Sequence, residues 1–148
     1  MARSPSLIVR IPVIALIAAC GRDQPAAPVP AAAAPLAGKP FYRVDRGPQP
    51  PCTSGGPCEA RVVLTALGDY HVNKDYPFKF VSDPAAGVAL DGPASFTLDG
   101  AKHGTLTIKF RPAAPGEAKL VGTFKLSVCS DDTCEIEAPT LEIAIPVT

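Results

Sequence analysis

The sequence predicts an all-β fold, an immunoglobulin-like antiparallel β-sandwich over residues 52–148. Apolar and polar residues alternate in several short runs, and turn-forming residues separate these runs. Alternation of this kind is typical of antiparallel strands that have one face on a core and the other in water. No segment places apolar residues at helical spacing over three turns. Several short strands within about 95 residues favour a sandwich, with an open barrel as the alternative.

Residues 1–19 have the features of a signal peptide, and Cys20 those of a lipid attachment site. Arg3 and Arg10 supply a positive start, and the apolar stretch that follows is far shorter than the about 20 residues of a permanent membrane span. The sequence IAAC at 17–20 resembles the lipobox of bacterial lipoproteins. In that family a lipid is attached to the cysteine and the chain is cut before it. An ordinary secretory signal or a short uncleaved anchor is the alternative.

The lipoprotein resemblance implies a location in the bacterial cell envelope, with the membrane as partner through a lipid on Cys20 and the domain facing the periplasm. The residue after this cysteine is Gly21 and not Asp. By resemblance, this favours the outer membrane over the inner one. Removal of Arg3 and Arg10 lowers the count of 14 basic residues to 12, against 14 acidic ones. A slightly acidic chain is not expected to bind nucleic acid, which requires a basic surface.

Residues 20–51 are rich in proline and alanine and show no sustained period of 2 or 3.6. Prolines at 25, 28, 30 and 35 prevent a continuous helix because each removes a donor and clashes with the preceding turn. The segment is therefore predicted to be a semi-extended tether. Within it, 41–44 (FYRV) is more apolar and is a candidate first strand.

The predicted domain follows from four alternating runs, at residues 61–67, 105–111, 119–128 and 141–147. Turn signals fall between the runs at residues 82–84, 90–93, 99–100 and 114–116. The chain has no tryptophan, so it is not the antibody type of domain, which packs a tryptophan on its disulfide. The expected large core residues are Phe78, Phe80, Phe96, Phe110 and Phe124.

Four cysteines remain in two close pairs, Cys52 with Cys58 and Cys129 with Cys134. An even number in an oxidising compartment favours disulfides, of which four cysteines allow three connectivities. Local pairing is the simplest. Closing such short loops contributes only about 2.2–2.4 kcal/mol, against about 4.6 kcal/mol for a bridge across some 80 residues. Two local bridges would therefore be inefficient staples, and an exposed bridge is also the more easily reduced kind.

The second cysteine pair is predicted to lie at the tip of a hairpin. Cys129 continues the run 119–128, whose even-numbered residues face the core, so it falls on the outer face. The loop Ser130–Thr133 consists of turn-forming residues and places Cys129 opposite Cys134. Asp131 and Asp132 disfavour a thiolate nearby, so we expect a pair that is acted upon and not a reactive nucleophile.

The order of motifs resembles the periplasmic N-terminal domain of the thiol:disulfide interchange protein DsbD. These motifs are YHVN at 70–73, YPFKF at 76–80, GTLTI at 104–108, and a cysteine pair on a late hairpin before a final strand. The resemblance implies an immunoglobulin-like fold and a redox role for Cys129 and Cys134, with a periplasmic or membrane thiol-disulfide protein as partner. The loop SDDT, the absence of a matching cap loop, and the added pair Cys52/Cys58 depart from the family.

Two functions remain open at this point. One is a lipid-tethered thiol-disulfide carrier that uses Cys129 and Cys134, and the other is a non-catalytic envelope module, binding or structural, whose disulfides are only structural. No cofactor or metal is expected, because His71 and His103 do not fit the common zinc spacings. Hydrolase and nucleotide-binding motifs are absent from the sequence, so thiol-disulfide exchange is the single enzymatic activity under consideration.

Overall fold

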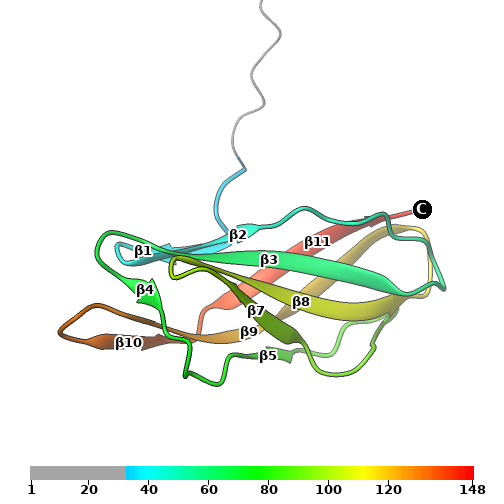
Figure 1. The fold of residues 1–148 in the computed structure, drawn as a ribbon. Coiled ribbons are helices and arrows are strands. Elements are labelled where there is room, and N and C mark those ends of the chain that lie inside the picture. Colours follow the sequence, from blue (N-terminus) through cyan, green and yellow to red (C-terminus); the bar gives the residue numbers. More distant parts are fainter. Residues whose placement is uncertain (1–32) are drawn as a thin grey trace, which may run out of the picture. The chain divides into compact units, whose positions relative to one another are not determined.

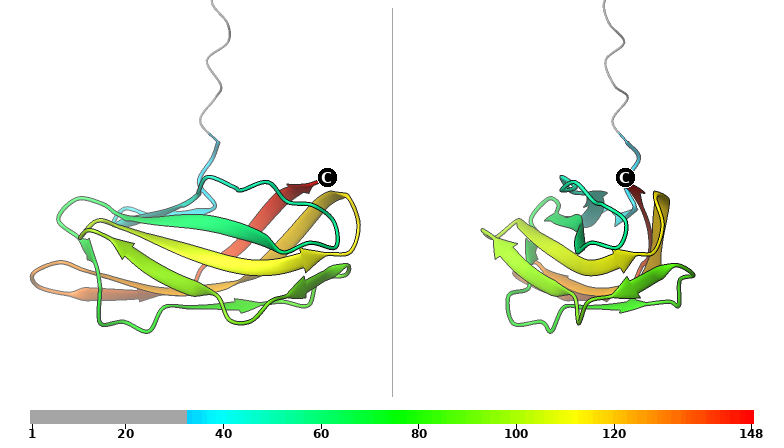
Figure 2. Two further views of the ribbon diagram at one scale, coloured as in Figure 1. Left: turned by 45° about the vertical axis from the view of Figure 1, so that its right-hand side comes forward. Right: turned by 90° about the vertical axis from the view of Figure 1, so that its right-hand side faces the viewer.

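Two antiparallel β-sheets face each other in residues 33–148, the part of the chain that the computed structural model describes (Figures 1 and 2). Six strands form one sheet and five form the other, and no residue in this part is helical. The prediction of an all-β, immunoglobulin-like antiparallel sandwich is therefore confirmed. The predicted signal peptide at residues 1–19 and the lipid site at Cys20 lie outside the described residues.

The first sheet has the strand order β1-β2-β3-β8-β6, and β7 also pairs with β8. Its strands are β1 (Ala37–Lys39), β2 (Tyr42–Arg46), β3 (Cys58–Ala66), β6 (Val88–Leu90), β7 (Ser95–Asp99) and β8 (His103–Pro112). The two long strands β3 and β8 form its centre, with Val62 opposite Leu106. Every second residue of both is buried, as their alternating sequences predict.

The second sheet is built around the long strand β9 (Gly116–Cys129). On one side of β9 lie β10 (Cys134–Glu137) and β11 (Thr140–Val147), which share a single register with it. On the other side lie two short strands, β4 (His71–Val72) and β5 (Lys79–Ser82). Each turn predicted from sequence lies at a connection between strands and overlaps the end of a strand by one residue.

The core between the sheets is formed by the inward residues of β3, β8, β9 and β11. Of the phenylalanines expected there, Phe80, Phe110 and Phe124 are buried. Phe78 and Phe96 are only half-buried, and their rings stack at the side of the core with centroids 3.9 Å apart.

The folded part begins before the predicted boundary at residue 52. Strands β1 and β2 lie within the segment that was expected to be tether, and β2 pairs with β3 along its whole length. The candidate first strand at residues 41–44 corresponds to β2. Tyr42 and Val44 are 2% and 0% exposed, because the FYRV motif has the alternation of a half-buried strand. In residues 33–148 there is no helix long and apolar enough to cross a membrane.

Candidate functional site: the Cys129–Cys134 disulfide

Both cysteine pairs are joined locally in the structure. Cys52 is bonded to Cys58 and Cys129 to Cys134, which is the simplest of the three connectivities that the sequence leaves open. The two bridges lie in different sheets, since Cys58 begins β3 and Cys129 ends β9. Each bridge can therefore be considered by itself.

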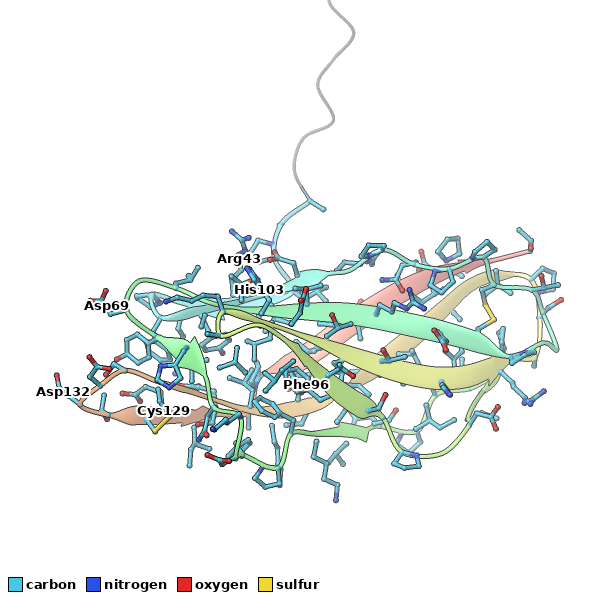
Figure 3. The ribbon with its side chains drawn as sticks, viewed as in Figure 1. Arg43, Asp69, Phe96, His103, Cys129 and Asp132 are labelled. Carbon is cyan, nitrogen blue, oxygen red and sulfur yellow. A yellow bond between two sulfur atoms is a disulfide. The ribbon has the colours of Figure 1, made fainter. Side chains whose placement is uncertain are left out.

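The Cys129–Cys134 bridge links directly opposed residues of β9 and β10, with Cα atoms 4.0 Å apart. Ser130 donates its backbone N–H to the carbonyl of Thr133 (2.8 Å), so these two form a hydrogen-bonded pair. Pairs alternate along an antiparallel ladder, and the next pair, Cys129 with Cys134, is therefore the close, non-hydrogen-bonded kind. The predicted hairpin geometry is confirmed (Figure 3).

The turn at the tip is organised by the hydroxyl group of Ser130. Its Oγ accepts the backbone N–H groups of Asp132 and Thr133, both at 3.3 Å. Serine favours turns for this reason, because its side chain bonds to the backbone locally. The arrangement leaves Asp131 and Asp132 exposed at the end of the hairpin, as Figure 3 shows for Asp132.

The two sulfur-bearing residues differ in their exposure. Cys129 is 6% exposed, whereas Cys134, on the edge strand β10, is exposed. Two residues further along β10, Ile136 is 67% exposed, more than any other large apolar residue described. Cys134 and Ile136 are on the same face of β10 because side chains alternate along a strand. Cys134, the exposed member of the disulfide, thus lies beside the exposed apolar side chain of Ile136.

The other side of Cys129 is occupied by β4. His71 is the register partner of Cys129, and both side chains point away from the core because Val72 and Val128 point into it. On the outer face, His71 of β4, Cys129 of β9 and Cys134 of β10 therefore lie side by side on three neighbouring strands.

The segment that follows β4 covers Ser127, the outer-face residue of β9 that precedes Cys129. Ser127 lies on the outer face but is fully buried. Asn73 donates its backbone N–H to the carbonyl of Ser127 (3.1 Å) and its side-chain amide to Ser127 Oγ (3.3 Å). This segment fixes β4 next to the disulfide.

The hairpin is tied to the opposite sheet by an ion pair between Glu137 on β10 and Lys39 on β1, with an Nζ–Oε1 distance of 2.6 Å. The hydrogen bond to Glu137 raises the pKa of Lys39 above its ordinary value. An exposed pair of this kind contributes little to stability. It joins the base of the hairpin to β1.

The Cys52–Cys58 bridge is different, because both of its residues are 3% exposed. The loop that it closes is also tied down by the last residue of the chain. Thr148 donates its backbone N–H to the carbonyl of Cys52 (2.9 Å), and Ser54 donates to the carbonyl of Thr148 (2.8 Å). A buried bridge within a fixed loop has the features of a structural disulfide.

The candidate metal ligands do not come together. His71 lies on β4, and His103 begins β8 in the other sheet, where its Nδ1 is 3.3 Å from Thr65 Oγ1 (Figure 3). Among residues 33–148 no three histidine, cysteine or acidic side chains are grouped to hold a metal ion.

Sequence reasoning placed Cys129 and Cys134 correctly but missed the residues beside them. The approach of His71 and the burial of Ser127 depend on β4, a strand of only two residues. Period-two alternation needs four or more residues to be recognised, so alternation did not mark this strand, although the motif YHVN at 70–73 contains it.

Comparison with protein-family models and with curated proteins gave no match. Among solved structures, the GAE domain of yeast GGA1 is similar at 12% identity and a TM-score of 0.46, over 74% of this chain and 96% of that one. The ASH/PapD-like domain of human CEP192 is similar at 11% identity and a TM-score of 0.36, over 78% of this chain and 92% of that one. Similarity at this level carries no information on function.

Proposed function

We propose that this chain is a lipid-anchored, periplasm-facing envelope protein whose domain carries electrons through the Cys129–Cys134 disulfide. The supporting observation is the asymmetry of the bridge, in which Cys134 is exposed beside Ile136 and Cys129 is covered. Exchange requires in-line access to one sulfur only, and the other sulfur leaves as a thiolate. Exposed bridges are also more easily reduced than buried ones.

The exchange takes place with a protein dithiol as the reductant. One thiolate of the partner attacks Sγ of Cys134, the bridge breaks, and Cys129 leaves as a thiolate that takes up a proton. The second partner thiolate then attacks the mixed disulfide and releases Cys134. Two electrons and two protons pass to this chain, whose bridge becomes two thiols, while the partner dithiol becomes a disulfide.

Electrostatics favour the role of a pair that is acted upon. Asp131 and Asp132 lie at the tip of the hairpin, and negative charge disfavours thiolate formation on the neighbouring sulfurs. A reduced pair in this setting is a modest nucleophile. It therefore depends on a partner that supplies the attacking thiolate.

The test is the reduction potential of each bridge, measured by equilibrating the chain in thiol redox buffers, trapping free thiols and mapping them by mass. We expect a potential above about −300 mV for Cys129–Cys134, with Cys52–Cys58 still oxidised in the same buffers. The double variant Cys52→Ala/Cys58→Ala is the matched control and should leave the first potential unchanged. A potential below about −300 mV for Cys129–Cys134 contradicts a carrier.

A non-catalytic envelope module, binding or structural, is the second candidate. It is favoured by the hydrogen-bonded turn at Ser130, which together with the bridge gives the hairpin a closed, ordered tip. In that case both bridges stay oxidised together throughout the titration.

The lipid anchor is tested separately. Growth with a labelled fatty acid should label the chain, and Cys20→Ala should remove the label and release the protein from the membrane fraction. Label that persists in Cys20→Ala contradicts the anchor at this residue and leaves the redox proposal untouched.

A further inference from the structure

The first half of β9 has a free edge. Strand β5 pairs with β9 only from Gly122 to Lys125, and β4 only at Val128 and Cys129. On the opposite side, β11 covers β9 from Gly116 to Thr123. In residues 33–148 no strand pairs with residues 116–120 of β9 on the β5 side. The right-hand view of Figure 2 shows this part of β9, in gold, with β11 beside it on one side only.

The direction of the free backbone groups follows from three hydrogen bonds. Phe124 donates to the carbonyl of Pro139, so even-numbered residues of β9 bond toward β10 and β11. Asp83 donates to the carbonyl of Val121 and Asn73 to that of Ser127, so odd-numbered residues bond toward β5 and β4. The N–H and C=O groups of Glu117 and Lys119 therefore point out of the free edge, where a further strand could bond to them.

An open groove of about 420 Å³ runs along this edge. Its far wall is the connection between β5 and β6, with the small side chains of Pro84, Ala85 and Ala86. No hydrogen bond joins Pro84, Ala85 or Ala86 to Glu117 or Lys119 in residues 33–148, so the groove separates this connection from the edge of β9.

The outer edge of β11 is protected against the addition of another strand, whereas the free edge of β9 is not. On β11 the backbone N–H and C=O groups of the even-numbered residues point away from β9. One of these residues is Pro146, which has no N–H to offer another strand. Proline at an edge is a common defence against strand addition. On the free part of β9 the corresponding positions carry Glu117 and Lys119.

Glu117 and Lys119 give this edge one negative and one positive charge, and these can pair with the opposite charges on the same edge of a second copy. In antiparallel pairing of two β9 strands, one register places Glu117 opposite Lys119 of the second copy, and Lys119 opposite its Glu117. The adjacent registers that keep the hydrogen bonds place Lys119 opposite Lys119, or Glu117 opposite Glu117. Opposite charges facing each other across two strands are favourable and like charges are not, so a single register is selected.

We propose that the free edge of β9 pairs with the same edge of a second copy of this chain, through Glu117 and Lys119 in two-fold antiparallel register. The pairing makes one continuous sheet from the β9-containing sheets of both copies. Lys119 also contacts Glu142 of its own chain (Nζ–Oε1 2.6 Å), so each lysine would lie between two carboxylates. The shared segment is short, and the dimer is therefore of the weak, small-interface class.

The first experiment maps the contact by zero-length crosslinking. Equal amounts of the full chain in ¹⁴N and ¹⁵N form are mixed in detergent solution and treated with a carbodiimide, which joins a carboxylate to an amine in direct contact. We expect a mixed-isotope crosslink between Glu117 and Lys119. The crosslink from Lys119 to Glu142 within one chain serves as the internal control. The absence of the mixed-isotope crosslink, when the control crosslink forms, overturns the proposal.

The second experiment tests the charges by sedimentation equilibrium of the full chain in density-matched detergent. Glu117→Lys or Lys119→Glu alone should weaken dimerisation roughly tenfold or more, because each places two like-charge pairs across the interface. The double exchange Glu117→Lys/Lys119→Glu should restore it. Lys125→Glu, on the covered part of β9, is the matched control and should have no effect.

Thermal unfolding of every variant shows that it is folded before its association is interpreted. A wild-type chain that stays monomeric at its highest soluble concentration overturns the proposal. A dimer that is unchanged in the single charge reversals overturns it as well, and places the contact elsewhere.

Discussion

At the scale of single residues, Gly104 is the glycine of the described residues against which a neighbouring side chain, the ring of Phe96, packs most closely. A Cβ atom at Gly104 would lie 2.2 Å from Cζ of Phe96. The ring cannot move away easily, because it stacks on Phe78 and lies 5.9 Å, centroid to centroid, from the buried ring of Phe124. Glycine is therefore required here by the space that the ring fills, and this position does not have a positive φ.

We expect Gly104→Ala to lower the free energy of unfolding by about 1–3 kcal/mol, the usual cost of overpacking. Urea denaturation measures it. The control is the same substitution in a Phe96→Ala background, where the obstructing ring is gone and the added cost should largely disappear. An equal cost in both backgrounds would show that the ring is not the cause.

At the scale of strands, the sequence was informative wherever a strand is long and has one buried face. The alternation in 105–111 and 119–128 predicted the inward residues of β8 and β9, and it placed Cys129 opposite Cys134. The physical reason is that a period of two leaves no choice of face once several residues are fixed.

The same reasoning failed for short strands. Strands β4 and β5 are defined by their pairing with β9, across a large separation in sequence, and not by a pattern of their own. The candidate site was therefore predicted in part: the bridged residues were found, but His71 and the buried Ser127 beside them were not. The free edge of β9 was missed for the same reason, since it exists where β5 ends.

At the scale of the whole molecule, the two sheets differ in how their edges are covered by further strands. In the first sheet, β1 and β2 cover the side of β3 that would otherwise be an edge. Strand β2 also brings Tyr42 and Val44 into the core. The sequence marked 41–44 as a candidate first strand but left it within the proline- and alanine-rich tether, because the tether and the first strands follow each other without a break.

A chain that starts at residue 52 is therefore expected to be much less stable than one that starts at residue 33. Burial of Tyr42 and Val44 is worth about 1.5–3 kcal/mol each, and their loss would also expose the edge of β3. The total loss of about 3–6 kcal/mol is comparable with the whole stability of a small domain, about 5–15 kcal/mol. Urea denaturation of the two chains measures the difference. Replacing Tyr42 and Val44 together by alanine, in the chain that starts at residue 33, should account for much of the loss. Equal stability of the two chains would mean that β1 and β2 are additions to a domain that is already complete at residue 52.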